Sequence, residues 1–486
     1  MIPCRKWWFH ILSLILLAIA GIAFNIYWQR REAAEELRQV LAEIDQADDG
    51  WRLKQIEAKR RVIPDQDNGT FIVMKAYRSL PKGWESTIAA KLLNELRDLE
   101  LAPPPVALPS QCAKNLNECL IAVQQAVIEA RELNETPRGR FAVEYTPDFI
   151  SSLVVEQQNG RAVAQLLYLD AFALLHSSEP TKTLQSVQAL FHAGRTMADE
   201  PFIISQLVRM NYQVMGVQCI ERTLGQTSVN EAVLSSLQRI ASEEAREDLF
   251  SIAIRGERAG MNECLSNIAH GDKPIAVTVE RIATMLQQHR ENWFDRFNDV
   301  FAMKMVYRSH AWLMRHYTQL IEDSSKKGSA KYDRLQQWVE IDKHMKIQAV
   351  QNRDLMLAAL LAPSARKIAE RERHADTLLH CTIAGLAAER FRLKHQRWPE
   401  SLDELIQAKL LAEAPEDLYD GKPIRLRRTA DGIVFYSVGK DGNYQGDALD
   451  RLEEFNPNQV RVEFRLWDPA KRRQPPLPPR KPPEDE

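Results

Sequence analysis

A loop near the end of the chain carries the residues whose types and spacing best suit metal chemistry. It reads YSVGKDGNYQGDALD over residues 436–450 and holds three glycines and three aspartates. Oxygen-bearing side chains recur along it as they do in the first half of a calcium loop: Asp441, Asn443, Gln445, Asp447 and Asp450. Leu452 stands at the twelfth position, where an EF-hand needs a bidentate Glu, so an EF-hand is excluded. Two interpretations remain, a calcium loop of another kind and a turn held by its own side-chain to backbone hydrogen bonds.

The rest of the chain offers no recognisable catalytic motif. GxSxG, GxxxxGK[ST], HExxH and GxGxxG are all absent. The eleven histidines are scattered. The pairs His310/His316 and His374/His380 are each six residues apart, a spacing that does not place two side chains on one helix face. No catalytic residue is therefore predicted, although a dyad formed between distant helices would not show in the sequence.

The six cysteines include no CxxC pair, which argues against a zinc ribbon or a thioredoxin-like site. Cys112 and Cys119 are seven residues apart. On one continuous helix this spacing is about 10 Å, too far for a disulfide. We expect both thiols to be unpaired; a bridge would need a bend between them.

The charge balance gives no reason to expect nucleic acid as a partner. The 64 basic and 66 acidic residues leave a net charge of −2. The basic clusters at 59–61 and 471–473 are short and lack interleaved aromatic residues. They are predicted to be solvated surface.

Residues 7–28 are the clearest physical signal in the chain. They contain no Asp, Glu, Lys or Arg, and as a helix they would span about 33 Å, which matches a hydrocarbon core of about 30 Å. Trp7 and Trp8 stand at one end, Tyr27 and Trp28 at the other, as interfacial aromatic residues do. The segment predicts a transmembrane anchor that contacts the lipid bilayer.

A cleaved signal peptide is the competing interpretation of this segment. Ala18-Ile19-Ala20 before Gly21 fits a small-residue cleavage site, but the apolar run continues past it, beyond the usual length of a signal-peptide core. We expect an uncleaved, single-pass anchor in the inner (cytoplasmic) membrane. A large domain after a short basic N-terminus most simply lies outside the cytoplasm.

Hydrophobic periodicity predicts a mainly α protein with an antiparallel helical array. The expected parts are the short N-terminus and anchor (1–31), membrane-proximal helices and a proline-rich connector (32–109), and an α-helical body (110–380). In the second part Leu37, Val40, Leu41 and Ile44 form an amphipathic stripe, which suits either an interaction helix or a helix packed on the body. Ser228–Glu231 and Ser401–Glu404 have the pattern of capping boxes.

The chain changes character after the body. Residues 381–468 are expected to form a small α+β module, in which a long helix leads into a hairpin. PIRLRR and IVFYSV are strand-like around the turn dipeptide Asp431-Gly432, and VRVEFRLWD could add a strand. Residues 469–486 carry seven prolines and are expected to be disordered or polyproline-like.

The terminal module resembles that of type II secretion major pseudopilins. RLKHQRWPESLDEL (392–405) and LYDGKPIRLRRTADGIVFYSVGKDGNYQGD (418–447) carry the resemblance. In that family a long helix leads through a WP-containing stretch into a hairpin, and the closing loop commonly binds calcium. The resemblance implies Asp441, Asp447 and Asp450 as calcium ligands, together with backbone carbonyls around Ser437 and Gly439.

Taken whole, the chain resembles a group of planctomycete envelope proteins with a single N-terminal anchor. The resemblance rests on DDGWRLKQIEAKRRVIPDQDN (48–68), GERA (256–259) and FRLWDPAKRRQPP (464–476). It implies an envelope protein without assigning an activity. The first expectation is a membrane-anchored, non-enzymatic scaffold or interaction protein whose protein partners the sequence does not identify. The alternatives are a component of a secretion or pilus-like assembly and an envelope hydrolase with a site between helices.

Overall fold

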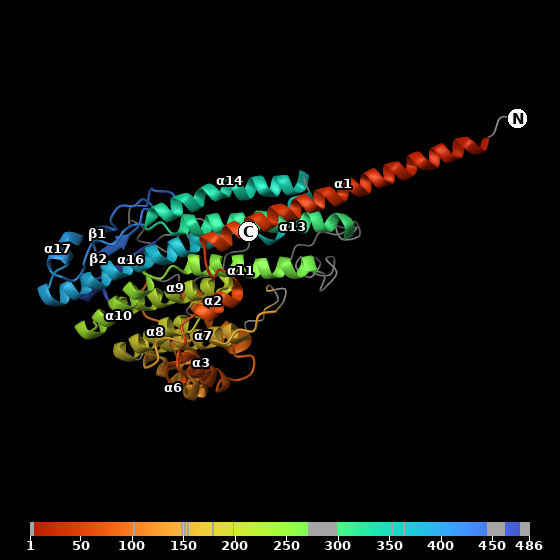
Figure 1. The fold of residues 1–486 in the computed structure, drawn as a ribbon. Coiled ribbons are helices and arrows are strands. Elements are labelled where there is room, and N and C mark those ends of the chain that lie inside the picture. Colours follow the sequence, from red (N-terminus) through yellow and green to blue (C-terminus); the bar gives the residue numbers. More distant parts are fainter. Residues whose placement is uncertain are drawn as a thin grey trace, which may run out of the picture.

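A computed structural model describes residues 4–100, 103–146, 149, 152, 155–176, 179–197, 199–270, 299–351, 353–362, 365–444 and 462–476. The predicted fold class is confirmed: the protein is mainly helical, with a long apolar N-terminal helix and a small antiparallel sheet near the C-terminus. Figure 1 shows the first helix leaving the body as a single rod.

Helices make up most of the described chain. The N-terminal ones are α1 (Cys4–Ala47), α2 (Leu53–Lys59), α3 (Gly69–Arg78), α4 (Ala90–Glu100), α5 (Ser110–Ala122) and α6 (Gln124–Arg131). The central ones are α7 (Val155–His176), α8 (Pro180–Arg195), α9 (Ile203–Gln226), α10 (Glu231–Glu244) and α11 (Leu249–His270). The last ones are α13 (Asp299–Ser324), α14 (Ser329–Gln351), α15 (Met356–Leu361), α16 (Ala365–His395) and α17 (Leu402–Gln407).

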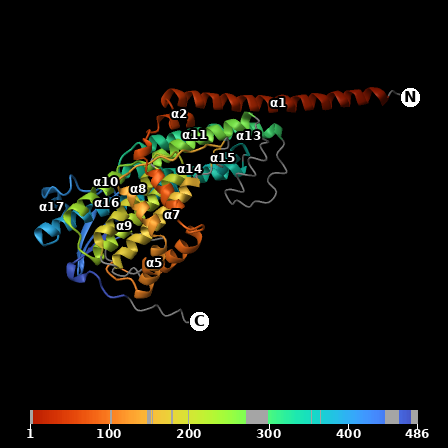
Figure 2. The ribbon, with the colours of Figure 1, turned by 90° about the horizontal axis from the view of Figure 1, so that it is seen from below.

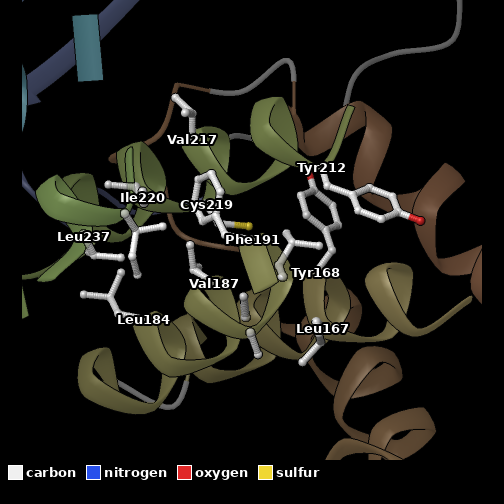
Figure 3. Packing of buried hydrophobic residues seen from close by; sticks show 14 of the residues in the cluster. Leu167, Tyr168, Leu184, Val187, Phe191, Tyr212, Val217, Cys219, Ile220 and Leu237 are labelled. Carbon is white, nitrogen blue, oxygen red and sulfur yellow. The ribbon is translucent and has the colours of Figure 1, made fainter. Parts of the chain in front are cut away.

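Two large hydrophobic clusters stabilise the described chain. The first joins α3 to α10 with the C-terminal part of α16 and the sheet. Figure 3 shows how Val187, Phe191, Cys219 and Ile220 meet in its interior. The second joins α1, α2, α11, α13 and α15 with the N-terminal part of α16. Because α16 contributes Ile368 to the second cluster and Leu386 to the first, it links the two. The division of the chain at residues 110, 381 and 469 stays a prediction.

The sheet forms where the sequence predicts strands. β1 (Arg425–Thr429), β2 (Gly432–Tyr436) and β3 (Glu463–Trp467) lie in the order β1-β2-β3, all antiparallel. Gly432 pairs with Thr429 and so begins β2 instead of completing the turn. Only glycine fits there, because a Cβ would lie 1.9 Å from the carbonyl oxygen of Leu466. The two-residue turn is instead Ala430-Asp431. The sheet packs on α16 so closely that a Cβ on Gly385 would lie 2.3 Å from the Phe464 ring.

Of the two predicted helix caps, one needs correction and one is confirmed. Helix α10 is capped by Asn230, whose side chain accepts a hydrogen bond from the backbone N–H of Val233 at 3.0 Å, so Ser228 is not the cap. Asn and Ser cap equally well, and the sequence offers both within three residues. At α17 the predicted cap Ser401 is confirmed, accepting from the Glu404 N–H at 3.3 Å.

The first part of the predicted disordered tail is ordered against the body. The Gln474 N–H donates to the Pro105 carbonyl at 2.7 Å, and the Ala107 N–H donates to the Gln474 carbonyl at 2.9 Å. The buried Arg472 guanidinium contacts both oxygens of Glu389 on α16, at 2.9 and 3.0 Å. Proline content predicted disorder, whereas these contacts hold residues 469–476 in place. Residues 477–486 lie outside the described residues.

Candidate functional site: the anchor helix and the closing loop

The apolar half of α1 is exposed along its whole length. α1 is the helix that, among the described residues, is long and apolar enough to cross a membrane, and its most apolar window has a mean hydropathy of 2.3 and no buried residue. Trp7 and Trp8 at its start and Trp28 near its end are all more than half exposed. In Figure 2 this half projects beyond the helical body. The helix thus presents an apolar surface of membrane-spanning length.

The second half of the same helix is part of the second hydrophobic cluster. Ala33, Leu37, Val40 and Ile44 are buried, spaced by three or four residues, as one face of a helix requires. They pack along α13, which runs beside α1 in both views of the fold. The predicted stripe is therefore confirmed as a face packed on the body, and the exposed apolar half and the packed half belong to one unbroken helix.

Charged side chains fix the contact between α1 and α13. Glu36 accepts hydrogen bonds from Arg308 and, at 2.5 Å, from Arg315. Arg308 also lies 3.5 Å from the Glu32 carboxylate. Arg308 and Arg315 are seven residues apart and so lie on one face of α13. We call Glu36, Arg308 and Arg315 the anchor clamp.

The turn after α1 is tied to α11. The Trp51 indole N–H donates to Asp45 at 2.8 Å, which folds the chain back onto the end of the helix. Buried Arg258 pairs with Asp48, and its guanidinium lies 5.1 Å from the Trp51 ring centroid. A second guanidinium nitrogen of Arg258 donates to Thr318 on α13 at 3.2 Å. Two of the sequence segments singled out above, 48–68 and 256–259, thus meet at one place.

The loop with predicted calcium ligands is organised by a residue that sequence reasoning did not single out. Asp417 is fully buried and accepts hydrogen bonds from the Ser437 hydroxyl at 2.7 Å and from the Val438 N–H at 2.9 Å. It also accepts from the Tyr419 N–H at 3.0 Å and pairs with Arg425. The Ser437 hydroxyl in turn accepts from the Gly439 N–H at 3.0 Å. One carboxylate therefore holds the start of the closing loop.

The predicted metal ligands are only partly within the described chain. Asp441 lies there, exposed, in a turn between Gly439 and Gly442, whose φ angles are +69° and +70°. Asp447 and Asp450 lie outside the described residues. Within the described part, no group of three or more His, Cys, Asp or Glu residues is arranged to hold a metal. The calcium ligand set stays a prediction.

Asp417 was missed because its partners are spread along the sequence. Its place just before the Asp420-Gly421 turn, with strand-like residues on both sides of the following hairpin, was the available signal. A carboxylate capping two separate backbone turns is a common use of Asp, but the sequence does not show which Asp takes that role.

The two cysteines that were expected to be unpaired are unpaired in the structure. Cys112 and Cys119 both lie on α5 and both are free thiols. Burial raises the pKa of each thiol, so neither has the lowered pKa of a reactive thiolate.

Comparison of the chain with models of protein families, with curated proteins and with solved structures found no match.

Proposed function

We propose that the protein is a membrane-anchored scaffold or interaction protein of the bacterial cell envelope without enzymatic activity. Residues 7–28 cross the inner membrane once, and the helical body with its terminal α+β module lies outside the cytoplasm. The body presents its surface to protein partners, and the pseudopilin-like module is part of that surface.

The observation that carries the proposal is the continuity of α1. Its exposed apolar half passes without a break into the half that is packed on α13 and clamped through Glu36. A flexible linker would let a tethered domain sample many orientations. A continuous helix with a buried second half instead holds the body at a fixed angle and height above the bilayer, which suits a scaffold.

Membrane fractionation of the full-length chain tests the anchor. Wild-type protein should stay with membranes after alkaline carbonate washing and be released by detergent. Leu14→Arg together with Leu17→Arg should move it to the soluble fraction, because an arginine at the centre of a span costs about 3 kcal/mol. Ile121→Arg, at an exposed apolar residue of α5, is the matched control and should leave the protein in membranes. Release of the wild type by carbonate would refute the anchor.

Orientation needs a separate measurement. Alkaline phosphatase fused after residue 486 should be active in cells, and a fluorescent protein fused there by the same secretion route should be dark. The reverse pattern would place the body in the cytoplasm.

Crosslinking in native membranes followed by purification should then recover defined protein partners. Turnover of a substrate that depends on a residue of the body would contradict the non-enzymatic role.

A further inference from the structure

A group of buried ionisable side chains joins three helices at the start of α14. Lys331 on α14 lies 2.5 Å from Glu372 on α16 and 2.8 Å from Asp248, which precedes α11. The Tyr332 hydroxyl lies 3.2 Å from Glu372 Oε2 and 3.1 Å from Asp376 Oδ2. Glu372 and Asp376 are one helical turn apart on α16, and both are buried. None of these residues belongs to the anchor or to the closing loop.

The hydrogen-bond geometry fixes where protons must lie. Glu372 accepts from the Lys331 ammonium and, through Oε1, from the Phe250 N–H at 2.7 Å. Burial raises the pKa of Glu372, but the Lys331 ammonium and the Phe250 N–H both stabilise its ionised form, and Asp376 has no comparable donors among the described residues. The Tyr332 hydroxyl has one proton but two carboxyl oxygens within hydrogen-bond distance. If it donates to Glu372, its contact with Asp376 is a hydrogen bond only when Asp376 carries a proton and donates it to the tyrosine oxygen.

The charges around Asp376 favour the same assignment. In the described part of the chain, Asp376 forms no ion pair with a lysine or arginine, since Lys331 is taken by Glu372 and Asp248. Arg373 on the same helix donates to the Leu418 carbonyl at 2.8 Å, and its guanidinium lies 4.4 Å from the Tyr419 ring centroid and 5.5 Å from the Tyr332 ring centroid, without an ion pair to Asp376. The other facing groups, Glu372 and Asp248, are acidic. An ionised Asp376 would thus be a buried charge next to a carboxylate.

The other ionisable groups near Asp376 on α14 and α16 do not change the assignment of the proton to Asp376. Asp333 on α14 is exposed and lies 3.7 Å from Arg373. His380, one turn beyond Asp376 on α16, is in contact through Nδ1 with the Glu416 carbonyl at 2.6 Å. Burial lowers the pKa of His380, which keeps it neutral. Burial, with the Glu372 carboxylate second, raises the pKa of Asp376 well above its usual range.

We propose that Asp376 is a protonated carboxylic acid at neutral pH, that its proton ties α14 to α16 through Tyr332, and that alkaline ionisation of Asp376 loosens α14. The junction is a pH-sensitive lock built into the fold. It goes beyond the scaffold role, because it makes the position of one helix of the body depend on the proton concentration around it.

Linkage gives the direction of the effect. The folded chain holds the Asp376 proton more tightly than the unfolded chain does, so its contribution to stability is complete below the pKa of an unfolded aspartate. That contribution falls as pH rises toward the pKa in the folded state. In this interval each pH unit raises the ratio of unfolded to folded protein tenfold, about 1.4 kcal/mol.

Asp376→Asn tests the lock because an amide N–H can donate to Tyr332 as the acid does, without titrating. In full-length protein in detergent, as pH rises above about 5, the unfolding ratio of the wild type should rise relative to Asp376→Asn, by up to about tenfold per pH unit. Asp333→Asn, at the exposed aspartate nearby, should keep the wild-type pH dependence. Equal pH dependence of wild type and Asp376→Asn would overturn the proposal.

Two further measurements address the proton and the helix directly. Infrared difference spectra at neutral pH should show a protonated carboxyl C=O band in the wild type that is missing in Asp376→Asn. If that variant does not fold, isotope labelling of aspartate in the wild type should shift a protonated carboxyl band; no shifted band would refute the assignment.

Hydrogen exchange, corrected for its intrinsic pH dependence, should show α14 losing protection at alkaline pH while α13 keeps it. Loss of protection in both helices together would mean general unfolding and no lock.

Discussion

The guanidinium of Arg258 lies 5.1 Å from the centroid of the Trp51 ring and pairs with Asp48, so a residue in the middle of α11 closes the turn that ends the anchor helix. These residues are more than two hundred positions apart in the sequence. Together with the anchor clamp, this contact attaches α1 to the body at two places along its second half.

Replacing Arg258 should weaken this attachment strongly. Arg258→Met keeps much of the side-chain volume but removes the charge from Asp48 and the cation from the Trp51 ring. We expect a loss of about 2–3 kcal/mol in the free energy of unfolding, below the full cost of breaking a buried pair because Asp48 is partly exposed. Denaturant unfolding of the full-length protein in detergent measures this change.

Arg255→Met is the matched control for that experiment. Arg255 reaches the same Asp48 at 3.3 Å, but its side chain is half exposed. Removing it should cost about 0.5 kcal/mol or less. Equal losses for the two variants would show that the buried Arg258 pair contributes no more to stability than the exposed Arg255 pair.

The anchor clamp should hold α1 by a salt-sensitive contact. Glu36→Gln keeps a hydrogen-bond acceptor but removes the charge that faces Arg308 and Arg315, and it should cost about 1 kcal/mol because these groups are partly exposed. The readout is hydrogen exchange of residues 33–44, which should increase in the variant. In the wild type, added salt should increase it in the same way.

Glu35→Gln controls for the loss of a negative charge on α1. Glu35 is exposed and pairs with Arg38 inside the same helix, and in the described part of the chain no ion pair joins it to α13. Its removal should leave exchange of residues 33–44 unchanged. An equal response to both variants would mean that the clamp contributes no more than the net charge of the helix.

Buried histidines should make the protein sensitive to acid. Burial lowers the pKa of His310 to about 3 and that of His316 to about 4. Both are buried on α13, and His310 Nε2 lies 3.1 Å from the Asn262 side-chain oxygen. Because the unfolded chain takes up protons first, their contribution is complete above the ordinary histidine pKa of about 6.5 and is lost as pH falls toward 4 and below.

His310→Gln removes one of these titrations while keeping an N–H donor for Asn262. The wild type should lose up to about 1.4 kcal/mol more than this variant for each pH unit below about 6. Thermal unfolding from about pH 7 to about pH 4 measures the difference. His344→Gln, at an exposed position of α14, should follow the wild type. If His310→Gln also had the pH dependence of the wild type, the pKa of His310 would be the same in the folded and the unfolded protein.

Local patterns explain why the helices and strands could be predicted. The stripe Leu37, Val40 and Ile44 shows the period of a helix face, and the β-rich runs around the Asp431 turn show the alternation of strands. Burial of the helix stripe follows this period, whereas β2 is buried from Gly432 to Phe435 without alternation. Within this limit the sequence was enough for the fold class.

Contacts between distant segments could not be read in this way. The Arg258–Asp48 pair and the Lys331–Glu372 pair bring together residues far apart in the chain, and neither has a distinguishing motif. Lys331 stands in the polar stretch DSSKKGSAKYD (323–333), whose composition is typical of a loop, yet α14 begins within it and Lys331 is buried. Its charge is compensated only by the folded arrangement of three helices.

The closing loop gives the last prediction, because Asp417, which holds the start of the loop, and Asp441, which lies in the loop, should behave differently. Asp417→Asn removes a buried charge that Arg425 and the donors from Ser437, Val438 and Tyr419 all use, and should cost about 2–3 kcal/mol. Asp441→Ala, at an exposed turn residue, should change stability by less than about 0.5 kcal/mol when EDTA is present. Denaturant unfolding of the full-length protein measures both.

Calcium separates the two interpretations of the loop. A structural turn held by Asp417 predicts the same unfolding curve in EDTA and in calcium for the wild type and for Asp441→Ala. A calcium loop predicts about 2.7 kcal/mol of added stability at one hundred times the dissociation constant, and Asp441→Ala should then lose that gain. Since Asp417 already satisfies the backbone at the start of the loop without a metal, we expect the loss caused by Asp417→Asn in either condition. If calcium restored the stability lost in Asp417→Asn, a metal and Asp417 would both order the loop.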